Sequence, residues 1–355
     1  MVKALWELRP DTATAFANLG YAYSKPEVAR MPDGTWAAFI ANGYGSTKGV
    51  ASLFVVNLAT GALIKEIVAE STNGSNGLSS VKLKVNASNV VQAAYGGDLL
   101  GHMWKFDLSS TSTASWGVAF SGNPLFTAPG GANQPITAQP LLINNTTSGK
   151  MVYFGTGKLL ETADKTTTAA QGFYAVWDAD NGAGNYTVAN LQPQSITAIT
   201  TVGTSQYLLT STTATNYASL KGWYLPLVLG TQLTGQRVIY PALTTNGRII
   251  FTTAYVDTTD PCSSQGSGYL VELDAINGSM FSYPVLDTTG DLLVNSSDTI
   301  VAGVYYSTGI PNINAILSTN GAQVKIVNLS SGEKKSQGEL GVTTSPGRIM
   351  WRQIQ

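Results

Sequence analysis

A strand that ends in a turn recurs along the chain, and this repeat constrains the fold more than any other feature. Each apolar, β-branched run predicts a half-buried strand, after which an Asn or Asp can bond nearby backbone amides and a Gly four positions later supplies a positive φ. The copies are FVVNLATG (54–61), YAVWDADNG (174–182), LVELDAING (270–278) and VKIVNLSSG (324–332), and HMWKFDLSS (102–110) is a related copy without the Gly.

The spacing of these turns predicts the architecture. Successive Asn and Asp positions (57, 107, 178, 274 and 328) are separated by about 50, 71, 96 and 54 residues, and the 96-residue gap fits two units. A period near 50 residues is what four short antiparallel strands with their loops require, so we expect a modified β-propeller of about seven blades, with six or eight left open. The stretch 183–225 is then an inserted loop or a hairpin extension of one blade.

Composition supports an all-β fold in one domain, 1–355. Charged residues make up 12% of the chain, about half the usual share, and Thr, Ser, Asn and Gly are abundant. Long stretches rich in Glu, Lys, Ala and Leu at helical spacing are missing, which argues against an α/β fold.

Charge and residue counts exclude several functional classes. The net charge of −1, with Lys and Arg scattered, leaves no basic face for nucleic acid. One cysteine, Cys262, and one histidine, His102, cannot build an intrachain disulfide or a zinc site of thiolates and imidazoles. No apolar run is long enough to span a membrane, and MVKALW at the start is not a signal peptide. We therefore expect either a cytosolic protein or a fragment of a longer exported chain.

Residues 95–110 carry a family resemblance. The segment YGGDLLGHMWKFDLSS resembles the Tyr-x-Gly-Asp-x-x-Gly-x-x-Trp-x-Phe-Asp-Leu signature of the PilC/PilY proteins of type IV pili. Further stretches follow the order of the family: LGYAYSKPEVARMPDGTWAAFIANGYGS (19–46), QPITAQPLL (134–142), MVYFGTGKLLE (151–161), DPCSSQGSGYLVELDAINGSMF (260–281) and GRIMWRQIQ (347–355). The match covers nearly the whole chain, and it is the combination that is specific.

The resemblance implies a C-terminal propeller preceded by a separate N-terminal region that is absent here. It also implies pilus assembly and extension, opposition to retraction, twitching motility and adhesion, at the pilus, cell surface or outer membrane of a Gram-negative-type bacterium. The implied partners are major or minor pilins and a host-cell receptor or abiotic surface.

The residues of the signature can also be interpreted without reference to a family. Asp98, between Gly97 and Leu99, suits a tight turn between two strands. Trp104 and Phe106 alternate onto one face of the next strand and are expected to be buried there. Direct ligand contact by Trp104 is the alternative. His102 and Cys262 have no sequence neighbours that would activate them, so we interpret both as structural.

Two segments are candidates for calcium. Many members of the PilC/PilY family carry an acidic, calcium-type loop before the signature. In this chain the ligand positions of that loop are occupied by Lys84, Asn86, Ser88 and Gln92, and a lysine ammonium repels a dication. The second segment is DTTGDLLVNSSD (287–298), whose predicted ligands in the order of a 12-residue calcium loop are Asp287, Thr289, Asp291, the Leu293 carbonyl, Asn295 and Asp298. Leu292 stands where such a loop has Gly, and an ordinary polar turn is the alternative.

Three functions compete. The first is a non-enzymatic, pilus-associated domain. The second is a quinoprotein-like (PQQ) propeller dehydrogenase, because the repeated strand also resembles the blade motif of that superfamily. Its cofactor pocket needs a cluster of acidic and basic residues, whereas the charges here are spread along the sequence. The third is a carbohydrate-binding propeller that uses Tyr and Trp as stacking platforms.

Overall fold

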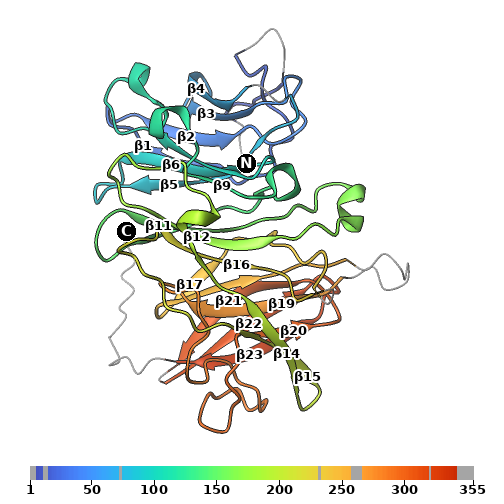
Figure 1. Cartoon of the computed structure of the whole chain (residues 1–355). Helices are drawn as coiled ribbons and strands as arrows, with labels where there is room; N and C mark the ends of the chain where they lie inside the picture. The colour runs from blue at the N-terminus through green and yellow to red at the C-terminus, as the bar shows by residue number, and fades with distance from the viewer. Residues whose placement is uncertain are drawn as a thin grey trace, which may run out of the picture.

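The computed structural model describes residues 5–10, 15–71, 74–230, 233–256, 266–319 and 321–341. In this part of the chain the regular structure consists of β-strands and short 3-10 helices, and no helix is long and apolar enough to cross a membrane. The strands form five sheets. In Figure 1 the first sheet lies at the top, the second and third follow below it, and the fourth and fifth lie together in the lower part.

The first two sheets come from the first 127 residues and are antiparallel. The first contains, in order, β1 (Glu27–Arg30), β2 (Trp36–Ala41), β3 (Ala51–Asn57) and β4 (Leu63–Glu70). The second contains β5 (Leu78–Val85), β6 (Val91–Asp98), β7 (His102–Asp107) and β8 (Gly117–Val118), with β9 (Phe126–Thr127) also paired to β7.

The other three sheets cover the rest of the described chain. The third has the spatial order β10 (Leu141–Asn144), β11 (Lys150–Gly155), β12 (Gly172–Asp178), β16 (Gly222–Pro226) and β13 (Gln192–Pro193). The fourth has the order β14 (Ile196–Val202), β15 (Ser205–Thr210), β20 (Gly303–Tyr306), β19 (Gly268–Asp274), β18 (Arg248–Thr252) and β17 (Leu243–Thr245). The fifth contains β21 (Pro311–Thr319), β22 (Ala322–Leu329) and β23 (Lys334–Leu340). The 3-10 helices are η1 (Thr113–Ser115), η2 (Phe120–Gly122), η3 (Gly131–Asn133), η4 (Thr162–Thr166) and η5 (Val188–Asn190).

The all-β class predicted from the sequence is confirmed. The stretch 183–225 contains the β14–β15 hairpin, which joins the fourth sheet because β15 pairs with β20. The predicted hairpin extension is confirmed for β14 and β15, but it is wrong for the end of the stretch, because β16 pairs with β12 as a regular strand of the third sheet. The count of about seven blades stays a prediction, since the described strands hydrogen-bond into five sheets.

Apolar side chains fill the space between consecutive sheets. Because successive residues of a strand point to opposite faces, each inner sheet contributes to two cores. On β11, Met151 and Tyr153 pack towards the fourth sheet, whereas Val152 and Phe154 pack towards the second. Burial on both faces explains why these strands are nearly continuous in apolar residues.

The repeated turn forms as predicted at most of its positions. The Oδ1 atom of Asn57 accepts the amides of Ala59 and Thr60, and Gly61 has a φ of 74°. The Asp274 turn is built in the same way. Asn328 departs from the pattern, because its side-chain oxygen is buried and has no hydrogen-bond partner among the described residues.

Two of these turns are each covered by the indole ring of a tryptophan. Trp223 Nε1 donates to the carbonyl of Ala275 at 3.0 Å, and a Cβ on Gly278 would lie 2.2 Å from the same indole. Trp6 and Gly61 repeat the arrangement at the first sheet, where Trp6 Nε1 donates to the carbonyl of Leu58 at 2.8 Å. The turn glycine is therefore required by space as well as by its φ.

Four charged side chains meet between the fourth and fifth sheets. Lys325 bonds Glu272 at 2.5 Å and also Glu339, and Arg248 lies 2.8 Å from Glu272. All four are at most 3% exposed. The charges that are spread along the sequence thus form one neutral buried cluster, so the expectation of dispersed charge is wrong at this place. The cause is the packing of β18 and β19 against β22 and β23.

Substitution of the turn glycines separates the effect of φ from the effect of packing. Gly278→Ala is expected to lower the free energy of unfolding by about 1–2 kcal/mol for the left-handed backbone and by about 1–3 kcal/mol more for overpacking against Trp223. Gly182→Ala is the matched control, since Gly182 has a φ of 78° in the same kind of turn and nothing within 4 Å of its added Cβ. Urea denaturation measures both, and equal losses would contradict the packing argument.

Candidate functional site

Asp98, at the end of β6, is a buried hydrogen-bond acceptor. Its Oδ1 accepts the amides of Leu100 at 2.9 Å and His102 at 2.8 Å. Its Oδ2 accepts Asn76 Nδ2 and Trp104 Nε1, both at 2.8 Å, and lies 2.9 Å from His102 Nδ1. The side chain is fully covered by protein. The tight turn predicted at Asp98 is confirmed, and its carboxylate is occupied by the protein's own donors.

The aromatic residues of the signature are buried as predicted. Trp104 and Phe106 both belong to the core between the first and second sheets. His102 is partly exposed and has the Asp98 carboxylate as its partner. Burial lowers the pKa of His102, but its hydrogen bond and charge interaction with Asp98 outweigh that effect, so the pKa lies above its ordinary value of 6.5.

The segment 287–298 forms a loop whose two buried carboxylates bind backbone amides. Asp287 Oδ1 accepts the amides of Thr289 and Gly290, and its Oδ2 accepts the amide of Leu292. Asp298 accepts amides in the same way from both ends of the loop. Burial raises the pKa of the Asp298 carboxyl, but these amide bonds outweigh it, so the pKa lies below its ordinary value.

The other predicted ligands lie towards the outside of the loop. Asp291 Oδ1 accepts the amide of Leu293, Asn295 Oδ1 accepts the amide of Ser297, and both side chains are exposed. The Thr289 hydroxyl lies 3.1 Å from Asp287 Oδ1. Among the described residues, no three Asp, Glu, His or Cys side chains gather as a metal site would need. Calcium binding at this loop stays a prediction.

Leu292 has the backbone conformation of the glycine that a 12-residue calcium loop has at this position. Its φ of 65° is the left-handed conformation that a glycine adopts easily. The residue at position 292 is not the glycine expected of a calcium loop, but the main chain there has the left-handed φ that the glycine would supply.

The segment before the signature is a hairpin turn between β5 and β6. Asn86 Oδ1 accepts the amides of Ser88 and Val90. The Lys84 ammonium forms an ion pair with Asp180. Cys262 lies outside the described residues.

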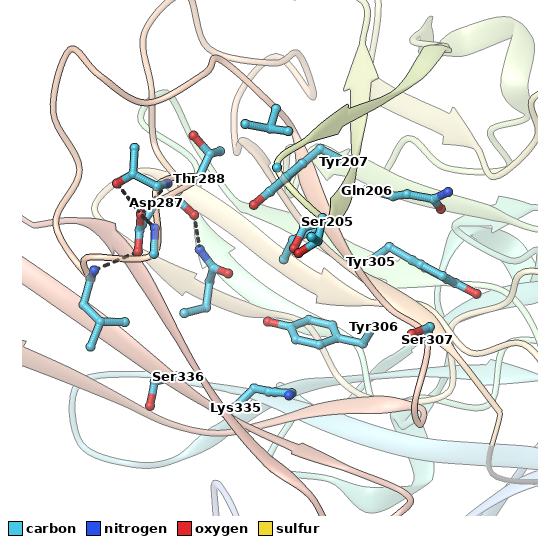
Figure 2. A pocket seen from close by; sticks show the side chains of 18 of the residues that line it. Ser205, Gln206, Tyr207, Asp287, Thr288, Tyr305, Tyr306, Ser307, Lys335 and Ser336 are labelled. Atoms are coloured by element: carbon cyan, nitrogen blue, oxygen red, sulfur yellow. Dashed lines mark hydrogen bonds between the residues drawn. The ribbon is translucent and has the colours of Figure 1, made fainter.

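A cleft of about 730 Å³ opens beside the loop 287–292. We call it the β15–β23 cleft, because its other walls are the start of β15, the end of β20 and the start of β23 (Figure 2). Its lining is rich in hydroxyl groups: Thr204, Ser205, Tyr207, Thr288, Thr289, Tyr305, Tyr306, Ser307, Thr308 and Ser336.

Tyr207 and Tyr306 are buried residues of this cleft. Figure 2 shows both hydroxyls directed to the side where Asp287 lies. The Tyr306 hydroxyl has no hydrogen-bond partner among the described residues, and burial raises its pKa well above the ordinary value of 10.0.

Sequence reasoning missed this cleft. Tyr207 lies in the stretch assigned to an insertion, and Tyr306 lies about 100 residues further along the chain. A signal was present, because Ser205 and Tyr207 alternate onto one face of a strand. Nothing local showed that β20 and β23 would complete the walls.

Comparison with known proteins identifies the family. The family model described as the PilY1 beta-propeller domain matches residues 2–214. The chain therefore belongs to the PilY1 β-propeller family, which confirms both the predicted fold and the resemblance of the signature.

Individual relatives match most or all of the chain. The type IV pilus biogenesis factor PilY1 of Pseudomonas aeruginosa is 32% identical over 100% of this chain and 34% of its own length. A homologue from Xylella fastidiosa is 35% identical over 77% of this chain and 20% of its own. The chain thus spans between a fifth and about a third of these relatives.

A solved structure supports the fold. The crystal structure of the Pseudomonas aeruginosa PilY1 C-terminal domain matches with a TM-score of 0.77 and 28% identity, over 95% of this chain and 74% of that one.

The Asp98–His102 pair predicts a pH dependence that one signal can follow, since the chain has one histidine. Its raised folded-state pKa means that the pair contributes stability fully below about pH 6.5, and that this contribution is lost as pH rises through the folded pKa. We expect Asp98→Asn to lower the pKa of His102, measured by NMR titration of the imidazole, and to lower the free energy of unfolding by about 1–3 kcal/mol. Asp107→Asn, in an exposed turn, should change neither, and an unchanged His102 pKa in Asp98→Asn would contradict the assignment.

Two variants distinguish an amide-binding role of the loop 287–298 from a calcium site. We expect Asp287→Ala to lower the free energy of unfolding by about 1–3 kcal/mol with or without chelator, because three amides lose their acceptor. Asp291→Ala should change it little without calcium, since one exposed amide is affected. Calorimetric titration and melting measure both variants. Saturable calcium binding that both variants lose would establish the predicted ligands, and a chelator-insensitive melting point without saturable binding would overturn them.

Proposed function

We propose that this domain supports the assembly and extension of type IV pili and opposes their retraction, and that it thereby supports twitching motility and adhesion. The observation that carries the proposal is the match of a PilY1 relative, named as a type IV pilus biogenesis factor, along the whole chain. The fold agrees with that relative, as the TM-score of 0.77 indicates. The proposed partners of this domain are major or minor pilins and a host-cell receptor or an abiotic surface.

The proposed location is the pilus or outer surface of a Gram-negative-type bacterium. A weakly charged chain rich in Thr, Ser, Asn and Gly suits the exterior, where polar side chains face water. Few surface charges leave direct hydrogen bonding and shape to determine what the domain contacts.

The proposed role is non-enzymatic. A quinoprotein-like dehydrogenase needs acidic and basic groups around an accessible cofactor. The four charged groups Arg248, Glu272, Lys325 and Glu339 pair with one another between two sheets, and none of them lines the β15–β23 cleft. The absorption spectrum of the purified chain tests this point, because a bound quinone absorbs visible light.

Cells whose gene lacks this domain are expected to lose surface pili and twitching. The measurements are electron microscopy of pili and the diameter of twitching zones, in cells that carry the intact gene, the deletion, or the control variant Asp107→Asn. The comparison is repeated in a background that cannot retract pili. Pili that return there indicate opposition to retraction, and pili that stay absent indicate a role in assembly. Unchanged piliation and twitching in the deletion would overturn the proposal.

A further inference from the structure

The β15–β23 cleft has the size and chemistry of a binding site. Ligand pockets are commonly about 300–1,000 Å³, and this cleft measures about 730 Å³. Its lining combines tyrosine rings with hydroxyl groups, which can both donate and accept hydrogen bonds.

The Tyr306 hydroxyl lacks a hydrogen-bond partner that a ligand could supply. A buried polar group without a partner costs about 1–3 kcal/mol relative to a bonded one, so such groups are uncommon in folded proteins. Tyr306 is 8% exposed, and its hydroxyl has no partner among the described residues. Since this hydroxyl is covered in the free protein, contact with a ligand requires side chains of the cleft to move, which is common on binding.

The charges of the cleft favour a neutral ligand. Asp287 is the acidic residue of the lining, and its carboxylate oxygens already accept backbone amides. Lys335 is the basic residue, and its ammonium lies 2.5 Å from the Glu333 carboxylate. Because backbone amides occupy the Asp287 oxygens and Glu333 pairs with the Lys335 ammonium, neither group offers an open partner to a charged ligand.

We propose that the β15–β23 cleft binds a neutral saccharide, with sugar hydroxyls bonded to Tyr306 and the neighbouring hydroxyl groups and the apolar face of the ring packed on tyrosine. Tyrosine suits this task because it offers an apolar ring and a polar tip on one rigid side chain. This proposal rests on the proposed function in one respect: the saccharide would be the ligand through which the domain adheres. Binding itself is a property of the 355-residue chain and does not require pili.

The test uses an array of immobilised neutral oligosaccharides that end in glucose, galactose, mannose or N-acetylhexosamine, beside sialylated and sulfated ones. The wild-type chain is expected to bind at least one neutral group. Tyr306→Phe should weaken that binding about three- to tenfold, the effect of one hydrogen bond. Its melting point should not fall, because the hydroxyl that is removed has no partner in the free protein.

Two control variants make the result specific. Tyr153→Phe removes a hydroxyl that donates to the Ala275 carbonyl at 2.8 Å outside the cleft. It should lower the melting point and leave saccharide binding unchanged. Lys335→Met keeps the length of the side chain without its charge, and neutral binding should persist.

Several outcomes would overturn the assignment. These are a flat array, neutral binding that Tyr306→Phe retains in full, and binding only of sialylated or sulfated glycans that Lys335→Met abolishes. Binding of an extended peptide along β23 in place of saccharide would do the same. A flat array with normal loss of pili on domain deletion would reject the saccharide and leave the pilus role intact. Neutral binding without any piliation defect would reject the pilus role and keep the cleft.

Discussion

The close approach of consecutive sheets is the constraint on which the rest of this fold depends. Between the third and fourth sheets the indole of Trp223 rests on Gly278 and donates its N–H to a carbonyl three residues earlier in the same turn. Trp6, which precedes the first strand, makes the same contact with the Gly61 turn of the first sheet. The contact leaves no room for a Cβ, so the glycine that the turn needs for its φ also sets how near the sheets can lie. Interiors are packed to crystal-like density, so one methyl group at such a place matters.

Polar groups within this packing are mostly satisfied inside the protein. Asp98 gathers donors from its own turn, from Asn76 and from Trp104, and so fixes the strand that carries the family signature. Asp287 and Asp298 fix their loop through backbone amides. The same residue types that look like metal ligands in a sequence therefore have an alternative task in loops, because amide N–H groups and cations seek the same oxygens.

The Tyr306 hydroxyl is one of the buried polar groups that have no hydrogen-bond partner among the described residues. It lies where the end of the fourth sheet meets the fifth, and the β14–β15 hairpin supplies one wall of its cleft. The hairpin is an addition to the fourth sheet's edge and not part of the repeated strand-turn pattern. Binding groups on such additions, held by a rigid scaffold, are common among proteins because loops and hairpins can vary without disturbing the core.

The sequence by itself determined the fold class, the repeated turns and the burial of Trp104 and Phe106, because these depend on local turn chemistry and on the two-residue alternation of a strand. It also supplied the residues through which the family resemblance was seen. Tertiary structure alone decided that the charges of Arg248, Glu272, Lys325 and Glu339 meet in one buried cluster, and that Gly278 lies under Trp223. It also decided that Tyr207 and Tyr306 face one cleft. The physical reason is that these partners lie 14 to 99 residues apart in the sequence. Their contact follows from which strands and sheets pack together, and local spacing carries no sign of it.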